Sequence, residues 1–219
     1  LYDGSGNPPF IGDLGITEDR IVAVGNLDNT TADNVIDARG KAVSPGFINM
    51  IGWGVTSLIT DGRGLSDITQ GITLEVFGEG NSMGPLSPNM KTEFPKYWDE
   101  IQPQWTSLGE YLEFLETKGV APNVASFIGA TTPRIHVLGQ DDVDPTPEQL
   151  QQMQELVREA MREGAVGVAS SLIYTPASFA ETAELIALAK AAAEYDGIYA
   201  SHLRNEGKQI FSALDELIT

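Results

Sequence analysis

A dense group of polar side chains follows an apolar, strand-like segment late in the chain. Residues 198–200 are apolar, and the run Ser-His-Leu-Arg-Asn-Glu-Gly occupies residues 201–207. His202, within this run, is one of two histidines in the sequence. Catalytic side chains of parallel-stranded barrels lie at such strand ends, where an imidazole serves as a metal ligand or a general base. The alternative is a surface histidine with ordinary hydrogen-bond partners.

Three further side chains have chemistry suited to binding a substrate. Arg204 carries a planar guanidinium that can donate two parallel hydrogen bonds to a carboxylate, and Asn205 follows it directly. Tyr174 lies just past the apolar run 166–169, where a substrate-contacting loop belongs. The alternatives are a salt bridge from Arg204 to Glu206 or a helix end, and packing of Tyr174 over the rim of a barrel.

The overall charge narrows the range of partners. Lys and Arg number 13 against 31 Asp and Glu, which gives a formal net charge of −18. Nucleic acids and anionic membranes both require a cationic face, so we expect neither as a partner. No apolar run is long enough to span a membrane and no signal peptide is visible. We therefore expect a soluble protein, cytoplasmic or periplasmic. Cysteine is absent, which excludes disulfides and thiolate metal ligands.

The pattern of apolar residues changes near residue 45. Before it, segments 11–16 and 20–25 flank a turn at 17–19 and predict a β-hairpin, with a further strand at 35–37. After it, short apolar runs alternate with helical segments, which is typical of successive βα units. The five strands predicted in this part are residues 47–50, 72–77, 124–128, 166–169 and 198–200.

Local signals predict where the intervening helices begin and end. Ser107 and Glu110 form one capping-box pattern, and Thr146 and Gln149 form another. A third helix is expected to start at Ser178. The glycines at 119, 164 and 197 are expected to stop helices in the left-handed conformation, and a last helix is expected at about 208–218. Residues 85–106 are expected to form a long lid-like loop held by Trp98 and Trp105.

These elements predict an α/β fold, a (β/α)8 barrel of the TIM type of which about five βα units are present in residues 46–219. Five strands leave two unpaired edges, so the partner we expect is the remainder of the chain's own barrel. An open doubly wound sheet would be complete with five strands, but the sequence lacks the Gly-x-Gly-x-x-Gly turn after its first strand.

Several segments resemble a known superfamily. Residues 1–6 and 36–48 resemble the opening of amidohydrolases, in which a small β-sandwich precedes the barrel; residues 1–45 would be part of it. Residues 70–73, 123–126 and 200–207 resemble, more narrowly, the N-acyl-D-amino-acid deacylases, or D-aminoacylases. The resemblance implies a bacterial, metal-dependent hydrolase that cleaves the amide bond of N-acyl-D-amino acids. It also implies that about half of the full-length protein lies outside this chain.

The same resemblance implies a set of metal ligands from which this chain departs. His202 matches a metal-binding histidine of the family. The usual His-x-His is missing from residues 49–54, and the amide of Asn49 would be a weak ligand. The usual cysteine after the second barrel strand is replaced by Glu79 or, in another alignment, by Gly80. Glu79 is either a metal ligand or a loop carboxylate. We expect about one zinc ion per site, and a general base beyond Thr219.

Three functions remain open at this stage. The first is hydrolysis of N-acyl-D-amino acids by metal-activated water. The second is a homologue that kept the fold, lost catalysis and serves as a binding or scaffold protein, because fold alone does not fix function. The third is a hydrolase of cyclic amides from the same superfamily. The acyl group, the metal and the oligomeric state are not determined by these patterns.

Overall fold

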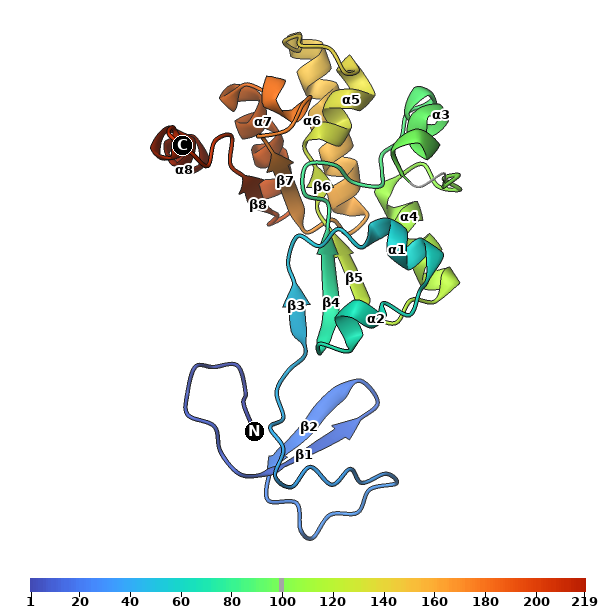
Figure 1. The fold of residues 1–219 in the computed structure, drawn as a ribbon, viewed down its shortest axis with the longest axis vertical. Coiled ribbons are helices and arrows are strands. Elements are labelled where there is room, and N and C mark those ends of the chain that lie inside the picture. Colours follow the sequence, from blue (N-terminus) through green and yellow to red (C-terminus); the bar gives the residue numbers. More distant parts are fainter. Residues whose placement is uncertain (99–100) are drawn as a thin grey trace. The chain divides into compact units, whose positions relative to one another are not determined.

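The computed structural model describes residues 1–98 and 101–219. The chain divides into two compact units, Leu1–Phe47 and Ile48–Thr219 (Figure 1). The sequence placed the change of pattern close to this division, after residue 45. The assignment of the first part to a β-sandwich and of the second to a barrel stays a prediction.

The first unit is built around the expected hairpin. Strands β1 (Asp13–Thr17) and β2 (Arg20–Gly25) pair antiparallel, with an irregularity in register between Gly15 and Ile16. The strand expected at 35–37 is wrong, because these residues have no regular structure and the side chains of Val35 and Ile36 are exposed. Their β-branched side chains favour extended backbone, but no neighbouring strand pairs with them among the described residues of this unit.

The second unit contains two small sheets that do not close into a barrel within the described residues. The strand orders are β3-β4-β5 and β6-β7-β8, and the pairs β4–β5, β6–β7 and β7–β8 are parallel. The strand bounds are β3 Phe47–Asn49, β4 Ile72–Phe77, β5 Asn123–Ser126, β6 Ile128–Gly129, β7 Gly167–Ser171 and β8 Ile198–His202. All five strands expected from the apolar runs are present, the third being divided into β5 and β6.

Phe127 separates β5 from β6 and connects the two sheets. Its backbone N–H donates to the carbonyl of Phe77, the last residue of β4, at 2.8 Å. Directly after β4, Gly78 has φ +97° and lies against the backbone of Phe127, with no space for a Cβ. Backbone contact this close is possible only at glycine, so this junction fixes the path of the chain beyond β4.

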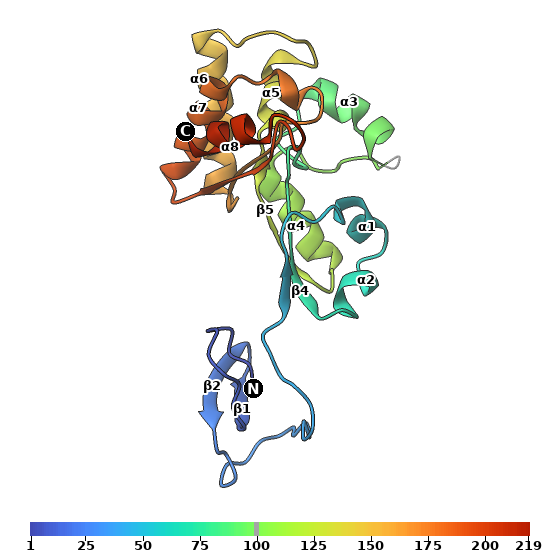
Figure 2. The ribbon, with the colours of Figure 1, turned by 60° about the vertical axis from the view of Figure 1, so that its left-hand side comes forward.

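Helices follow the strands, as the βα pattern predicts. Their bounds are α1 Val55–Thr60, α2 Leu65–Ile68, α3 Pro88–Tyr97, α4 Leu108–Lys118, α5 Thr131–Leu138, α6 Pro147–Arg162, α7 Thr182–Ala193 and α8 Ile210–Ile218, with a 3-10 turn η1 at Ala177–Phe179. In Figures 1 and 2, α6 and α7 lie side by side against β6, β7 and β8. None of the helices in residues 1–98 and 101–219 is long and apolar enough to cross a membrane.

The helix starts predicted from capping boxes are confirmed. Ser107 and Thr146 each accept from a backbone N–H three residues on, and Glu110 and Gln149 bond back to the start of the helix. The start at Ser178 is wrong, because that residue lies in η1 and α7 begins only after Glu181.

Two other expectations about local structure are also wrong. Asp196 takes the left-handed conformation at φ +59° in place of Gly197, which instead packs closely on Ala192 and Met161. The stretch 85–106 contains α3 in place of a lid-like loop, and its residues 99–100 lie outside the described part.

The two faces of the sheets carry separate apolar clusters. The large core lies between strands and helices and includes Phe77, Tyr111, Ile128 and Val168. A small cluster of Val76, Phe127 and Ala169, with Ala200 at its edge, occupies the other face. Because side chains alternate along a strand, residues in step with Val76 and Ala200, including His202, belong to this second face.

A buried ion pair links α5 to α7 within the large core. Arg134 Nη1 donates to Glu184 Oε2 at 2.6 Å, and Arg134 Nη2 donates to the carbonyl of Val143. Both side chains are almost completely buried. Burial raises the pKa of Glu184, and the charge of Arg134 opposes that rise. Removing one partner would leave the other charge buried without compensation.

We predict that Glu184→Gln lowers the free energy of unfolding by about 3–5 kcal/mol, because the guanidinium of Arg134 stays buried without its counter-ion. Urea denaturation at pH 7 measures the change. Glu194→Gln is the matched control: it removes the partner of Arg158 at the surface, where water screens the pair, so its effect should be much smaller. Equal effects of the two substitutions would contradict the prediction.

Candidate functional site

The candidate site lies at the ends of three strands, β4 in one sheet and β7 and β8 in the other. Ser171 and His202 are the last residues of β7 and β8 and are paired in register. Glu79 follows the end of β4 by two residues. Parallel strands end at the same edge of a sheet, so segments distant in sequence bring these side chains together.

Both nitrogens of the His202 ring face a carboxylate. Nδ1 lies 3.4 Å from Glu79 Oε1, and Nε2 lies 3.2 Å from Glu206 Oε1. The imidazole and the Glu79 carboxylate are largely buried, whereas Glu206 is more than half exposed. The ring of Tyr174 meets the imidazole edge-on, with ring centroids 5.4 Å apart. The structure thus brings together His202, Glu79 and Tyr174, which the sequence had singled out.

The separation of His202 from Glu79 suits two ligands of one metal ion. At 3.4 Å, the Nδ1–Oε1 distance is longer than the usual hydrogen bond. Zinc binds imidazole nitrogen and carboxylate oxygen at about 2.0–2.2 Å, so two ligands of a tetrahedral ion lie roughly 3.3–3.5 Å apart. Glu206 on the opposite nitrogen matches the carboxylate that commonly orients a ligand histidine. The donor set present therefore fits part of a metal site.

That donor set is incomplete in the part of the chain that the structure describes. No group of three or more His, Cys, Asp or Glu residues within residues 1–98 and 101–219 is placed to hold a metal ion. A catalytic zinc ion usually has three protein ligands, so the described residues supply at most two of them at this position. Asn49, weighed above as a substitute ligand, donates instead to Asp67 at 3.2 Å.

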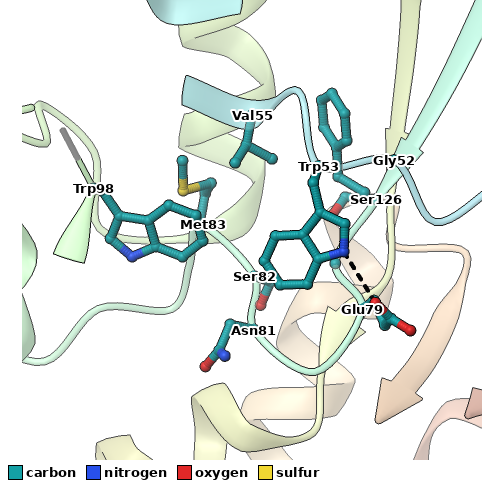
Figure 3. Close-up of a pocket in the computed structure, with 11 residues that line it drawn as sticks. Gly52, Trp53, Val55, Glu79, Asn81, Ser82, Met83, Trp98 and Ser126 are labelled. Carbon is teal, nitrogen blue, oxygen red and sulfur yellow. Dashed lines mark hydrogen bonds between the residues drawn. The ribbon is translucent and has the colours of Figure 1, made fainter. Parts of the chain in front are cut away.

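Glu79 is also held from the side away from His202. The indole Nε1 of Trp53 donates to Glu79 Oε2 at 3.0 Å, which Figure 3 shows as a dashed line. Trp53, Glu79, Asn81, Met83 and Trp98 line a small recess with room for about one water molecule. The recess is too small for an acylated amino acid, so it does not define the substrate pocket.

Glycines set the path of the loop that carries Glu79. Gly80 has φ +70°, and a Cβ there would come within 2.6 Å of Ser171 Oγ. The carbonyl of Gly80 accepts from the N–H of Thr131 at 2.9 Å. The Ser171 hydroxyl is buried and has no hydrogen-bond partner among the described residues. The loop therefore packs directly on the ends of β6 and β7, and an unused polar group remains beside it.

Arg204 and Asn205 are engaged within the protein. Arg204 forms a bidentate pair with Glu216 in α8 and donates to the carbonyls of Ser178 and Ala180. The Asn205 side-chain oxygen accepts from the N–H groups of two residues just before α8, Gly207 and Gln209. These contacts fix the turn between β8 and α8, and a substrate-binding role for either residue stays a prediction.

An ion pair shifts the pKa values of two groups near this turn. The Arg204 guanidinium, bonded to the Glu216 carboxylate, holds the pKa of that carboxyl below its usual range. The same contact raises the pKa of Arg204.

Deeper in the unit, burial raises the pKa of Glu75, assisted by the negative charge of Asp67. Glu75 lies on the helix-facing side of β4 and away from His202, so we assign it no part in the site.

Sequence reasoning missed two contributors to the site. Trp53 was noted only as part of a segment without histidine, and its bond to Glu79 spans 26 residues of sequence. Glu206 was considered only as a partner for Arg204, whereas it faces His202. Its spacing of four residues from His202 was a usable signal, but no pattern in the sequence pointed to Trp53.

Several known proteins are similar in sequence to this chain. No protein-family model matches the chain. It is 34% identical to D-aminoacylase of Alcaligenes xylosoxydans xylosoxydans over 99% of its own length and 45% of the relative. It is 35% identical to the N-acyl-D-aspartate deacylase of the same organism, over 100% of its length and 44% of the relative. The chain thus spans about half the length of the curated relatives that it matches.

Solved structures give the same result. A crystal structure of D-aminoacylase, described as defining a subset of amidohydrolases, matches with a TM-score of 0.85 and 33% identity over 97% of this chain and 45% of the other. N-acyl-D-glutamate deacylase from Bordetella bronchiseptica, complexed with zinc and a phosphonate inhibitor, matches with a TM-score of 0.85 and 31% identity over 99% and 46%. The mixed α/β fold matches the N-terminal region of an amidohydrolase. Within that class, the chain belongs with the N-acyl-D-amino-acid deacylases and corresponds to their N-terminal portion.

We predict that Gly78→Ala destabilises the second unit far more than Gly119→Ala. Both glycines have a positive φ, which costs a residue with a Cβ about 1–2 kcal/mol. Only at Gly78 would the Cβ collide with backbone, that of Phe127, which adds about 1–3 kcal/mol of overpacking. Urea denaturation of both variants tests this, since open space surrounds Gly119. Similar losses would show that the close contact at Gly78 does not constrain the loop.

We predict that Glu216→Gln lowers stability at pH 7 by about 1.5–3 kcal/mol, because Arg204 loses hydrogen bonds to a charged partner. The pKa of Glu216 is lower in the folded protein than the ordinary glutamate value of 4.5, because Arg204 is bonded to its carboxylate. Its contribution is therefore complete above about pH 4.5 and is lost as the pH falls through the lowered pKa. Denaturation of wild type and variant from pH 7 downward should show the difference shrinking at acid pH; a constant difference would contradict the assignment.

Proposed function

We propose that the chain carries part of the active site of a metal-dependent hydrolase that cleaves the amide bond of N-acyl-D-amino acids. The observation that carries the proposal is the 3.4 Å separation of His202 Nδ1, at the end of β8, from Glu79 Oε1, just after β4. It occurs in a fold that matches the deacylases at a TM-score of 0.85. Two relatives with structures carry metals, copper in one and zinc in the other, which supports metal use here.

In this proposal, His202 and Glu79 are two ligands of one zinc ion. Glu206 holds the far nitrogen of the imidazole and so fixes its ring and tautomer. When bound, zinc polarises a carbonyl group and lowers the pKa of a water molecule. The further ligands and the general base lie outside this chain.

Substrate contacts in the proposal come from the loops after β7 and β8. The Tyr174 ring is more than half exposed and stands over the imidazole, so it can cover an acyl or side-chain group beside the metal. Asn205 lies in the turn after His202. Arg204 has Nε and Nη2 committed to Glu216, which leaves an N–H of Nη1 for a substrate carboxylate. The acyl group and the side-chain preference are left open.

The remainder of a (β/α)8 barrel is the partner proposed for the exposed apolar surface of the second unit. Ile198 in β8 is about half exposed, and Phe211 and Ile218 in α8 are about four-fifths exposed. Three further βα units packed on β8 and α8 would cover these side chains and complete eight strands.

A second function, that of a binding or scaffold protein without catalysis, is favoured by one observation. The described residues hold no group of three metal-ligand side chains. The two functions differ in whether the whole protein binds zinc at His202 and turns over substrate.

We predict that His202→Asn in the whole protein lowers zinc content to background and reduces kcat/KM for N-acyl-D-amino acids at least about 100-fold, because a ligand is lost. Elemental analysis and a deacylation assay measure the two effects. His136→Asn is the matched control. It replaces the other histidine of this sequence, which lies in α5, and it should leave zinc content unchanged.

Two results would overturn this proposal. A wild-type protein that binds no zinc would favour the scaffold function. Zinc content unchanged by His202→Asn would place the metal elsewhere.

A further inference from the structure

We propose that Trp53 is a positioning residue whose indole N–H fixes the Glu79 carboxylate so that one oxygen faces His202. The inference rests on the proposed function in one respect, namely that the pair of His202 and Glu79 holds a metal ion. It adds a residue that the motifs of the sequence did not indicate.

The two oxygens of the Glu79 carboxylate face different neighbours. Oε2 of Glu79 accepts from Trp53 Nε1 at 3.0 Å, while Oε1 lies 3.4 Å from Nδ1 of His202. Of the described side chains, only Trp53 donates a hydrogen bond to this carboxylate. The bond therefore selects which oxygen is presented to the imidazole.

The indole of Trp53 can donate a hydrogen bond but cannot accept one through its nitrogen. Its N–H is a donor with no accepting lone pair, so Trp53 binds a carboxylate oxygen but does not compete with it for a cation. A hydrogen bond to a ligating carboxylate is the usual support around metal sites, and losing such support typically costs 10–100-fold in metal affinity. The indole is thus suited to holding Glu79 in place from behind.

The indole of Trp53 is itself held in place by neighbouring backbone and aromatic contacts. The N–H of Gly52, the residue before Trp53, donates to the carbonyl of Val76 in β4 at 2.7 Å. The Trp53 ring stacks on Trp98, with centroids 6.4 Å apart and planes 15° from parallel (Figure 3). Trp98 stacks in turn on Phe94, which meets the buried ring of Trp105. The donor is therefore connected to the core through a continuous series of aromatic contacts.

The hydrogen bond is tested first without any metal. On the whole protein, the indole N–H cross-peaks of the three tryptophans of this sequence are assigned in a nitrogen–proton correlation spectrum with Trp53→Phe, Trp98→Phe and Trp105→Phe. Glu79→Ala should shift the Trp53 peak and speed its exchange with solvent. The peak of Trp105, which donates to the carbonyl of Met83, should stay in place. A Trp53 peak indifferent to Glu79→Ala overturns the proposal.

The positioning role is tested by zinc affinity, measured in competition with a chelator on the whole protein. Trp53→Phe keeps an aromatic ring and removes the N–H, and should weaken zinc binding about 10-fold. Trp98→Phe is the matched control and should change the affinity less than about 2-fold, because phenylalanine keeps a ring to stack on Trp53 and the Trp53 donor is untouched. In a Glu79→Ala background, which removes the acceptor, Trp53→Phe should have no further effect, since residues that act through one another are not additive.

The outcomes separate the two proposals. Zinc binding by the wild type that is unchanged by Trp53→Phe overturns the role of Trp53 and leaves the proposed function standing. An equal effect of Trp53→Phe with and without Glu79 shows that Trp53 acts otherwise than through Glu79, and also overturns the role. Absence of zinc binding by the wild type overturns the proposed function and the positioning role together, while the spectra still report whether the hydrogen bond exists.

Discussion

The close backbone contact between the loop after β4 and the junction of β5 and β6 is the constraint on which the site depends. Gly78 lies against Phe127 without space for a side chain, and the carbonyl of Gly80 bonds to Thr131. Because both ends of Glu79 are fixed in this way, its side chain has little choice of direction. It reaches His202 on one side and Trp53 on the other.

The site combines rigid strand ends with charged groups that are already paired. Glu216 accepts two of the four hydrogen bonds that Arg204 donates, and backbone carbonyls accept the other two. The pairing with Glu216 ties α8 to the turn after β8. His202 is held between two carboxylates, of which the buried one is stabilised by an indole. This arrangement presents nitrogen and oxygen donors at a spacing suited to one metal ion, and in the proposed function the remaining ligands come from another part of the protein.

Local signals in the sequence predicted the elements well where one residue decides the outcome. The capping boxes at Ser107 and Thr146 formed because their bonds lie within four residues and need no tertiary contact. Predictions failed where contacts with residues distant in the sequence decide the local structure. Ser178 has a capping residue's chemistry, but its segment is drawn into η1, and its carbonyl accepts from Arg204. The strand expected at 35–37 lacks a pairing partner in its own unit.

The sequence by itself determined the βα order, the strand that ends at His202, and the relationship to the deacylases. It also named His202 through its place at a strand end, and Glu79 through the resemblance to the deacylases. Tertiary structure alone decided that they lie 3.4 Å apart, that Glu206 faces the imidazole, and that Trp53 donates to Glu79. The physical reason is the sequence separation of the contacting residues. A helix cap joins residues within one turn, whereas contacts between strand ends depend on sheet register and on the paths of loops, which no short segment encodes.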